Sequence, residues 1–267
     1  MLKDITIGQY YVADSVMHRL DPRTKILLVL GYIVMLFFAK DLMGMIPAFL
    51  LLAAAYLLAK IPGRMILKSL KPNLPILLLT GVLNLFFVKT GQLLVDVWFI
   101  KIYEDGIRHA LLLMVRILLL IVSSSLLTYT TSPISLTDGI ERLLSPLKIV
   151  RFPAHELAMM MTLALRFIPT LIEETEKIMN AQKARGADLE SGGLLTRVRS
   201  LIPIFIPLFV SAFRRAEELA LAMDCRCYQG DVGRTRMKQL HFGRSDLLAA
   251  LVVVLCMVLV MIMPKVI

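Results

Sequence analysis

The sequence predicts an all-α, polytopic membrane protein with about five transmembrane helices and a cytoplasmic region of long amphipathic helices. Of its 267 residues, 58 % are hydrophobic and 19 % are charged, whereas a water-soluble domain has about 45–50 % apolar and roughly 25 % charged residues. The mean hydropathy is +0.76. The apolar residues also form long runs, as burial in lipid requires. Together these observations exclude an ordinary water-soluble globular domain.

A helical hairpin is expected first. Asp21 and Pro22 predict a helix start, because Asp is a good N-cap and Pro fits the first helical position. The apolar run 26–39 follows, residues 40 and 41 interrupt it, and a second run covers 42–59. Spans of about 18 residues are just long enough to cross the hydrocarbon.

A short amphipathic helix is expected in residues 60–73. One of its faces is largely apolar and the other is basic, with Met65, Ile66, Ser69 and Leu70 opposite Arg64, Lys68 and Lys71. This pattern indicates a helix at the membrane surface. Three further spans are expected at 74–88, 107–129 and 246–263, and residues 89–106 suit an exposed loop with interfacial aromatics.

Residues 131–245 differ in character, since they hold 16 Lys and Arg and 12 Asp and Glu but keep a helical period. Two apolar helix faces are expected, formed by Leu171, Ile172, Thr175, Ile178, Met179 and Gln182, and by Phe213, Ala216, Leu219, Ala220 and Met223. The apolar patches 157–168 and 201–210 are short for crossings, and we interpret them as parts of long helices along the inner leaflet. The expected organisation is a membrane domain 1–130, cytoplasmic helices 131–245 and a final transmembrane helix 246–267.

The distribution of basic residues predicts the orientation. Residues 1–25, 60–71 and 131–245 contain 24 Lys and Arg, whereas the segments expected on the opposite side contain five, namely Lys40, Lys89, Lys101, Arg108 and Lys265. Basic residues accumulate in cytoplasmic loops. The N-terminus is therefore expected in the cytoplasm and the C-terminus outside, as five crossings require.

Several other functions are not indicated. The net charge of +10 follows membrane topology and predicts no nucleic-acid partner. Residues 1–15 lack the pattern of a cleavable signal peptide. The three cysteines, Cys225, Cys227 and Cys256, form neither a disulfide framework nor a set of metal ligands.

The motifs of nucleotide hydrolysis and of common hydrolases, GxxxxGK[ST], HExxH and GxSxG, do not occur in the sequence. We therefore expect no catalytic residues, no cofactor and no enzymatic activity. Active transport would draw its energy from an ion gradient or from a separate ATPase subunit.

The two amphipathic helices end alike, at Arg185 and Arg226. Each arginine follows a Glu by nine residues and an Ala by four, a weak internal repeat. A cation is favourable near a helix C-terminus, and Gly186 can provide the left-handed residue that ends the first helix. A guanidinium presented there can bind a carboxylate of a partner through two hydrogen bonds. The alternative is a pair of solvated arginines that only cap their helices.

Four segments occur in the order found in one known family: SVMHRLDPRTK, TSPISLTDGIERLLSPLK, LALRFIPTLIEETEKIMNAQKARGAD and the second arginine-tipped helix. Over nearly the whole chain the sequence resembles the transmembrane T component of energy-coupling factor transporters. The resemblance implies an ABC importer of the prokaryotic cell membrane. In it, two coupling helices dock on two ABC-type ATPase subunits, and a membrane-embedded S component binds the substrate. Micronutrients are the implied substrates, vitamins first and transition-metal ions second.

The family's docking motifs carry over residue by residue. The first motif is formed by three consecutive residues, Ala184, Arg185 and Gly186. In the second, Arg226 stands between Cys225 and Cys227, so the arginine is retained and the roles of its neighbours are open. The resemblance also implies that the apolar faces of the coupling helices pack on each other and against the S component.

Two polar residues are expected at membrane depth, Arg116 in the span 107–129 and Asn84 in the span 74–88. A charge at that depth is a functional candidate, but Arg116 can equally be structural and bond to neighbouring polar groups. A self-sufficient permease or secondary transporter is the alternative function, and a membrane-bound enzyme is a more distant one.

Overall fold

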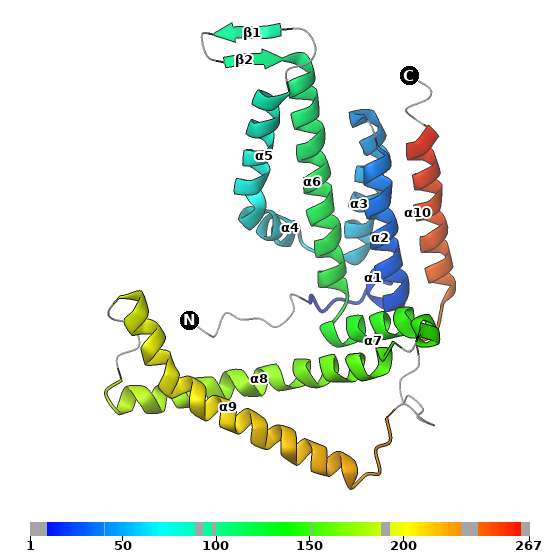
Figure 1. The fold of residues 1–267 in the computed structure, drawn as a ribbon. Coiled ribbons are helices and arrows are strands. Elements are labelled where there is room, and N and C mark those ends of the chain that lie inside the picture. Colours follow the sequence, from blue (N-terminus) through cyan, green and yellow to red (C-terminus); the bar gives the residue numbers. More distant parts are fainter. Residues whose placement is uncertain are drawn as a thin grey trace. The chain divides into compact units, whose positions relative to one another are not determined.

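The computed structural model describes residues 10–39, 41–88, 93–97, 100–150, 152–187, 193–230 and 240–262 (Figure 1). The chain divides into two compact units. We call Gly8–Gly139 with Leu240–Ile267 the membrane unit, and Ile140–Gln239 the arm unit. The boundary falls inside a helix, α7 (Pro133–Leu144).

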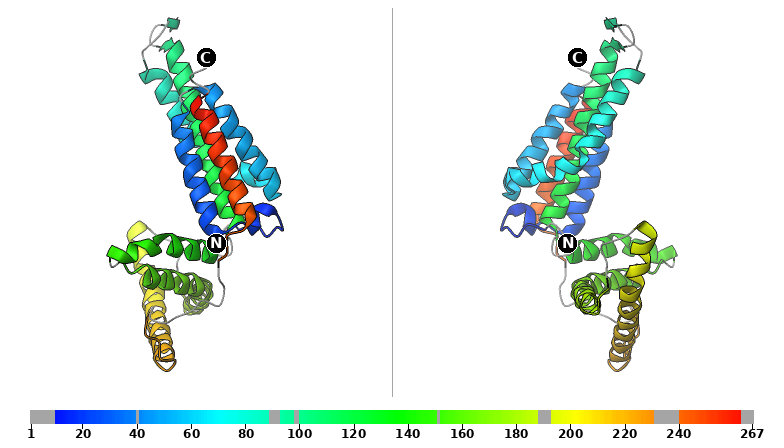
Figure 2. Two further views of the ribbon diagram at one scale, coloured as in Figure 1. Left: turned by 90° about the vertical axis from the view of Figure 1, so that its right-hand side faces the viewer. Right: turned by 90° about the vertical axis from the view of Figure 1, so that its left-hand side faces the viewer.

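In its described part, the membrane unit consists of helices and one short hairpin. Its elements are α1 (Val16–Arg19), α2 (Pro22–Phe38), α3 (Leu42–Ala59), α4 (Gly63–Leu70), the 3-10 turn η2 (Lys71–Asn73), α5 (Leu74–Phe87), β1 (Leu93–Val97), β2 (Ile100–Tyr103), α6 (Glu104–Thr130), the start of α7, and α10 (Arg244–Ile262). Figure 2 shows α10 in front of α6 and between α2 and α3. The last helix of the chain therefore completes a bundle that begins with the first membrane helices.

The core of this bundle is apolar, with Met35, Leu36, Met45, Leu119 and Val260 almost fully buried. Two tyrosine hydroxyls within it find backbone acceptors. The Tyr32 hydroxyl donates to the Ala48 carbonyl at 3.0 Å, and that of Tyr56 to the Val122 carbonyl at 2.9 Å. Each bond joins two helices and gives a buried hydroxyl the partner it requires.

The expected all-α membrane fold is confirmed, because five helical segments in the described residues are long and apolar enough to cross a membrane. They are Leu42–Ala59, Gly63–Phe87, Glu104–Thr130, Ala154–Ala184 and Arg244–Ile262. One member differs from the expected set. The expected span in α2, which has 17 residues, is not among the five, whereas the helix at 154–184 is. Its expected cytoplasmic location stays a prediction.

The segment expected to be a loop, 89–106, is more ordered than predicted. Its described residues form the antiparallel hairpin β1–β2, in which Val97 pairs with Ile100, and α6 begins already at Glu104. The β-branched residues on both sides of the connection favour strands. The remaining residues of this segment lie outside the described part, as do Lys40, Lys89 and Lys265.

The amphipathic helix expected in residues 60–73 is present as α4, and its location at the membrane surface stays a prediction. Met65, Ile66 and Leu70 are half-buried and pack against the core, whereas Arg64 and Lys68 are exposed. The Tyr129 hydroxyl of α6 donates to the carbonyl of Met65 at 3.1 Å. The amphipathic face is thus attached to α6.

The arm unit contains two long helices, α8 (Ala154–Ala184) and α9 (Leu194–Asp224), preceded by the end of α7 and a 3-10 turn, η3 (Ser145–Val150). Both helices have 31 residues and extend about 46 Å. The predicted apolar face of α8 is half-buried. Much of the corresponding face of α9 is exposed.

A cluster of buried polar contacts lies at the start of α2. The Asp246 carboxylate accepts the backbone N–H of Asp21 at 2.9 Å and that of Gly243 at 2.8 Å. The Lys25 ammonium donates to the carbonyls of His18 and Thr130 at 3.1 and 2.9 Å. His18, Asp21 and Lys25 belong to the segment SVMHRLDPRTK, one of the four that carried the family resemblance. This segment therefore joins α1, α2, α6 and α10 at one end of the bundle.

Replacing Asp246 with Ala should remove the acceptor of the buried Asp21 N–H and that of the part-buried Gly243 N–H. Each unsatisfied buried donor costs about 1–3 kcal/mol, so the midpoint of thermal unfolding in detergent should fall clearly. The control is Asp14→Ala, which removes an exposed ion pair with Arg19 and should change the midpoint little. Equal midpoints for the two variants would contradict a structural role of Asp246.

Candidate docking site at two helix ends

The first candidate arginine, Arg185, lies at the C-terminal end of α8. The N–H of Gly186 bonds to the carbonyl of Lys183, and that of Ala187 to the carbonyl of Gln182, both at 3.0 Å. Gly186 has φ +84°. This bond pair around a left-handed residue is a Schellman motif, which glycine favours because it has no Cβ.

The end of α9 has the same construction. The N–H of Cys227 bonds to the carbonyl of Asp224 at 2.9 Å, and that of Tyr228 to the carbonyl of Met223 at 3.1 Å. Cys227 takes the left-handed conformation, with φ +53°. Cys227 therefore occupies the position that Gly186 has in α8, and Cys225 the position of Ala184.

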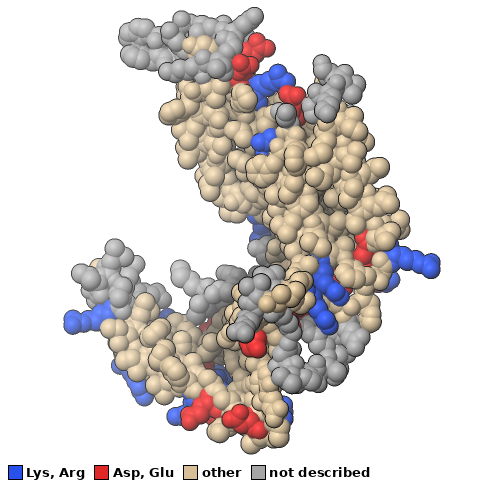
Figure 3. Space-filling view, turned by 45° about the vertical axis from the view of Figure 1, so that its right-hand side comes forward, with Lys and Arg blue, Asp and Glu red and all other residues tan. Residues whose placement is uncertain are grey.

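Arg185 and Arg226 consequently have equivalent backbone settings, each directly before the left-handed residue. Both side chains are exposed, and neither has an ion-pair partner within the described ranges. Each guanidinium keeps five donors for a partner. The partial negative charge of a helix C-terminus favours a cation at this position. Figure 3 shows Lys and Arg atoms projecting from the arm unit, whereas the face of the membrane unit seen in this view has few charged atoms between its two ends.

The two long helices are joined by a polar contact that the sequence reasoning missed. The Glu174 carboxylate of α8 accepts hydrogen bonds from the Ser211 hydroxyl and the Arg215 guanidinium of α9. Nearer the tip of α8, the Gln182 amide donates to the carbonyl of Pro203 at 3.4 Å. Glu174 interrupts the predicted apolar face of α8. A charged residue in that position was the one feature of the sequence that could have indicated a polar contact between α8 and α9.

An apolar stripe runs along the exposed side of α9. Phe205 and Phe209 stack with their centroids 5.9 Å apart, and Phe209 meets Phe213 edge to face at 4.6 Å. All three rings are more than half exposed. An apolar surface of this kind marks an interaction site.

The two polar residues expected at membrane depth, Arg116 and Asn84, make contacts close by in the structure. The Arg116 guanidinium donates to the carbonyl of Ala39, at the end of α2, at 2.7 Å and lies over the ring of Phe37. A cation at a helix C-terminus is favourable, so the contact supports a structural role. The side-chain amide of Asn84 donates to the Thr80 carbonyl of its own helix at 2.9 Å. Both contacts lie within the membrane unit.

Fold and site together define a class: a polytopic membrane subunit with a separate helical arm unit whose two long helices end in exposed arginines. The sequence profile of the CbiQ family, described as cobalt transport protein, matches residues 13–238. Several curated relatives carry the name Energy-coupling factor transporter transmembrane protein EcfT. That of Acidaminococcus fermentans is 54 % identical over 97 % of this chain and 96 % of its own length. Those of Ruminiclostridium cellulolyticum and Lactococcus lactis subsp. cremoris are 49 % and 42 % identical over at least 99 % of both chains.

The chain belongs to this family of transmembrane components of energy-coupling factor transporters. The resemblance that the sequence motifs suggested is thus confirmed.

The left-handed caps lead to a prediction about local stability. Cys227→Gly should stabilise the end of α9 by about 1 kcal/mol, because it removes the Cβ from a left-handed residue, and Gly186→Ala should destabilise α8 by a similar amount. Hydrogen exchange of the last-turn amides should slow in the first variant and accelerate in the second. Gly193→Ala is the control, since Gly193 has φ −69° and open space at the Cβ position. Unchanged exchange at both helix ends would contradict this account.

Proposed function

We propose that this protein couples ATP hydrolysis by two separate ATPase subunits to uptake of a micronutrient through a membrane-embedded S component. The observation that carries the proposal is the equivalent placement of Arg185 and Arg226 at the ends of two long helices. One helix tip then serves each ATPase. The names of the relatives, as transmembrane proteins of an energy-coupling factor transporter, support a complex with further subunits.

The chemistry of these tips suits an acidic groove on each ATPase. The Schellman bonds set the direction of the last backbone turn, so that the arginine leaves each helix from a defined position. A planar guanidinium can hold a carboxylate through two parallel hydrogen bonds. Movement of an ATPase would in this way act directly on a helix that is hydrogen-bonded to its neighbour through Glu174.

The S component is proposed to contact the apolar stripe Phe205–Phe209–Phe213. This surface is exposed in the described structure, and its burial against an apolar partner would remove aromatic area from water. The S component would select the substrate, with vitamins as the expected class. The profile description that mentions cobalt makes a transition-metal ion the second class.

The proposed topology has five crossings, formed by α2, α3, α5, α6 and α10, in the cell membrane of a prokaryote. The N-terminus and the arm unit then lie in the cytoplasm and the C-terminus outside. The excess of Lys and Arg in the segments assigned to the inside supports this orientation.

Docking is tested by pull-down of the two ATPases with the solubilised protein. Breaking a buried, hydrogen-bonded charge pair costs about 2–5 kcal/mol, which corresponds to a roughly 30-fold or larger loss of affinity. Arg185→Ala and Arg226→Ala should each weaken assembly, and the double variant should nearly abolish it. Arg→Lys should restore binding only in part, because an ammonium lacks the planar fork.

Arg214→Ala is the matched control, since Arg214 is an exposed arginine of α9 away from its tip. It should retain both ATPases and transport normally in proteoliposomes. If the double tip variant behaves like this control, the two arginines only cap their helices. If the protein alone binds and transports solute without ATPases, the self-sufficient permease is correct.

Topology is tested with a membrane-impermeant thiol reagent on a Cys256→Ser variant. Cys225 and Cys227 are exposed at the tip of α9, and they should react in inside-out vesicles but not in intact cells. Labelling in intact cells would mean that another helix, such as α8, crosses the membrane before α9. A tag after Ile267 should be accessible from outside.

A further inference from the structure

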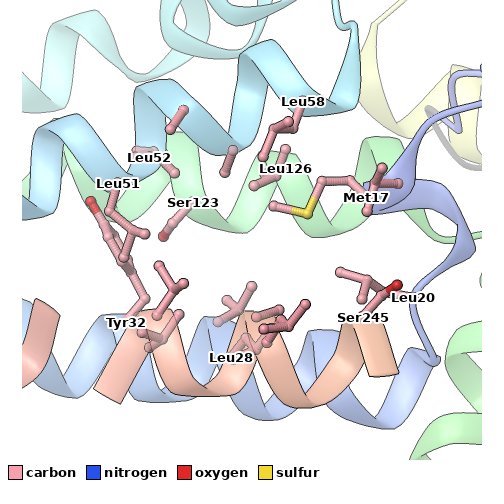
Figure 4. A pocket seen from close by; sticks show the side chains of 18 residues that line it. Met17, Leu20, Leu28, Tyr32, Leu51, Leu52, Leu58, Ser123, Leu126 and Ser245 are labelled. Atoms are coloured by element: carbon pink, nitrogen blue, oxygen red, sulfur yellow. The ribbon is translucent and has the colours of Figure 1, made fainter. Parts of the chain in front are cut away.

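The membrane unit contains an apolar cavity of about 340 Å³, lined by residues of α1, α2, α3, α6 and α10. Figure 4 shows it between α2 and α10 on one side and α3 on the other, with α6 behind. Tyr32 and Leu51 lie toward one end, and Met17, Leu20 and Ser245 toward the other. The cavity therefore lies along the bundle, parallel to its helices.

The cavity results from the packing of α10. Near its C-terminal end α10 is held tightly, since Val260 is fully buried and Cys256 packs against the core. Nearer its start, α10 and α3 line the cavity mainly with Leu and Val, together with Ala249 of α10 and Ala54 and Ala55 of α3. A larger side chain at one of these alanines would occupy part of the space.

Two of the three polar side chains that line the cavity already have hydrogen-bond partners. The Tyr32 hydroxyl already donates to the Ala48 carbonyl, and the Ser123 hydroxyl donates to the carbonyl of Leu120 at 2.9 Å. An engineered apolar cavity of about 150 Å³ stays dry and binds benzene, and this one is more than twice as large. An apolar ligand is therefore the suitable occupant.

The lining of the cavity also suits a flexible occupant. It is formed by five elements, and its side chains are almost all apolar. A flexible hydrocarbon chain can fit, and the bilayer around the membrane unit supplies such chains. At the end of the cavity marked by Ser245, the neighbouring Arg244 is exposed and has no ion-pair partner in the described part of the chain. The adjacent Asp246 is buried and bonded to backbone N–H groups.

We propose that this cavity binds one acyl chain of a membrane phospholipid, with the lipid phosphate beside Arg244. The chain lies between α10 and α3, beside Ala249, Ala54 and Ala55. The lipid is then an integral part of the bundle, distinct from the lipids that only surround it.

The test uses the complete transporter complex in nanodiscs that contain phosphatidylglycerol with a photoactivatable acyl chain. Cross-linked residues are identified by mass spectrometry. In the wild type, label should appear on cavity residues such as Met17 and Leu52. Ala249→Phe should fill part of the cavity and exclude the acyl chain, so that labelling of these residues falls by about tenfold or more. Ala250→Phe is the matched control, because Ala250 neighbours Ala249 but does not line the cavity.

Two further readouts complete the test. After delipidation, Ala249→Phe should unfold at a temperature equal to or above that of the wild type, which separates a filled cavity from a damaged fold. Arg244→Gln should reduce the retention of phosphatidylglycerol on the delipidated protein, whereas Arg64→Gln, at an exposed arginine of α4, should not. Cavity labelling that Ala249→Phe leaves unchanged, or that is no stronger than labelling of the exposed face of α5, would overturn the proposal. So would labelling that occurs in the isolated subunit but is lost in the complex.

Discussion

The buried carboxylate of Asp246 is the interaction on which the arrangement of the membrane unit depends. It binds the N–H of Asp21, 225 residues earlier in the chain, and so joins the start of the last helix to the start of the first long one. Arg23 bonds to the carbonyl of Leu240 at 2.9 Å, and a Cβ at Gly139 would lie only 3.1 Å from that of Pro22. The chain therefore leaves the membrane unit and returns to it beside the same turn of α2.

The two arginine-tipped helix ends depend on backbone hydrogen bonds more than on the residues that flank the arginines. Gly186 and Cys227 differ in side chain, but both adopt positive φ and receive the same pair of bonds. A left-handed cysteine costs some stability, and the bonds of the cap offset this cost. The position of the arginine is therefore conserved between the two helices although their sequences match poorly.

The membrane spans and the two faces of α4 could be predicted from the sequence, because hydropathy and helical period are local properties. The contacts that organise the units could not. Asp246 looked like an acidic residue before a span, and nothing local pairs it with Asp21. Glu174 and Arg215 lie 41 residues apart, so their pairing requires the tertiary crossing of α8 and α9. The hairpin at residues 93–103 was missed because its β-branched alternation is short and lies between charged and glycine residues.

The crossing of α8 and α9 gives the two tips different mechanical compliance. Gln182 of α8 bonds to α9 three residues before Arg185. Arg215 of α9 bonds to α8 eleven residues before Arg226. These two contacts lie about 5 Å and about 17 Å along the helices from the arginines, so the same angular fluctuation about each contact displaces the α9 tip roughly three times as far. The α8 tip is therefore the stiffer of the two and the α9 tip the more flexible. A partner bound at the α8 tip would meet a larger restoring force for the same displacement than a partner bound at the α9 tip.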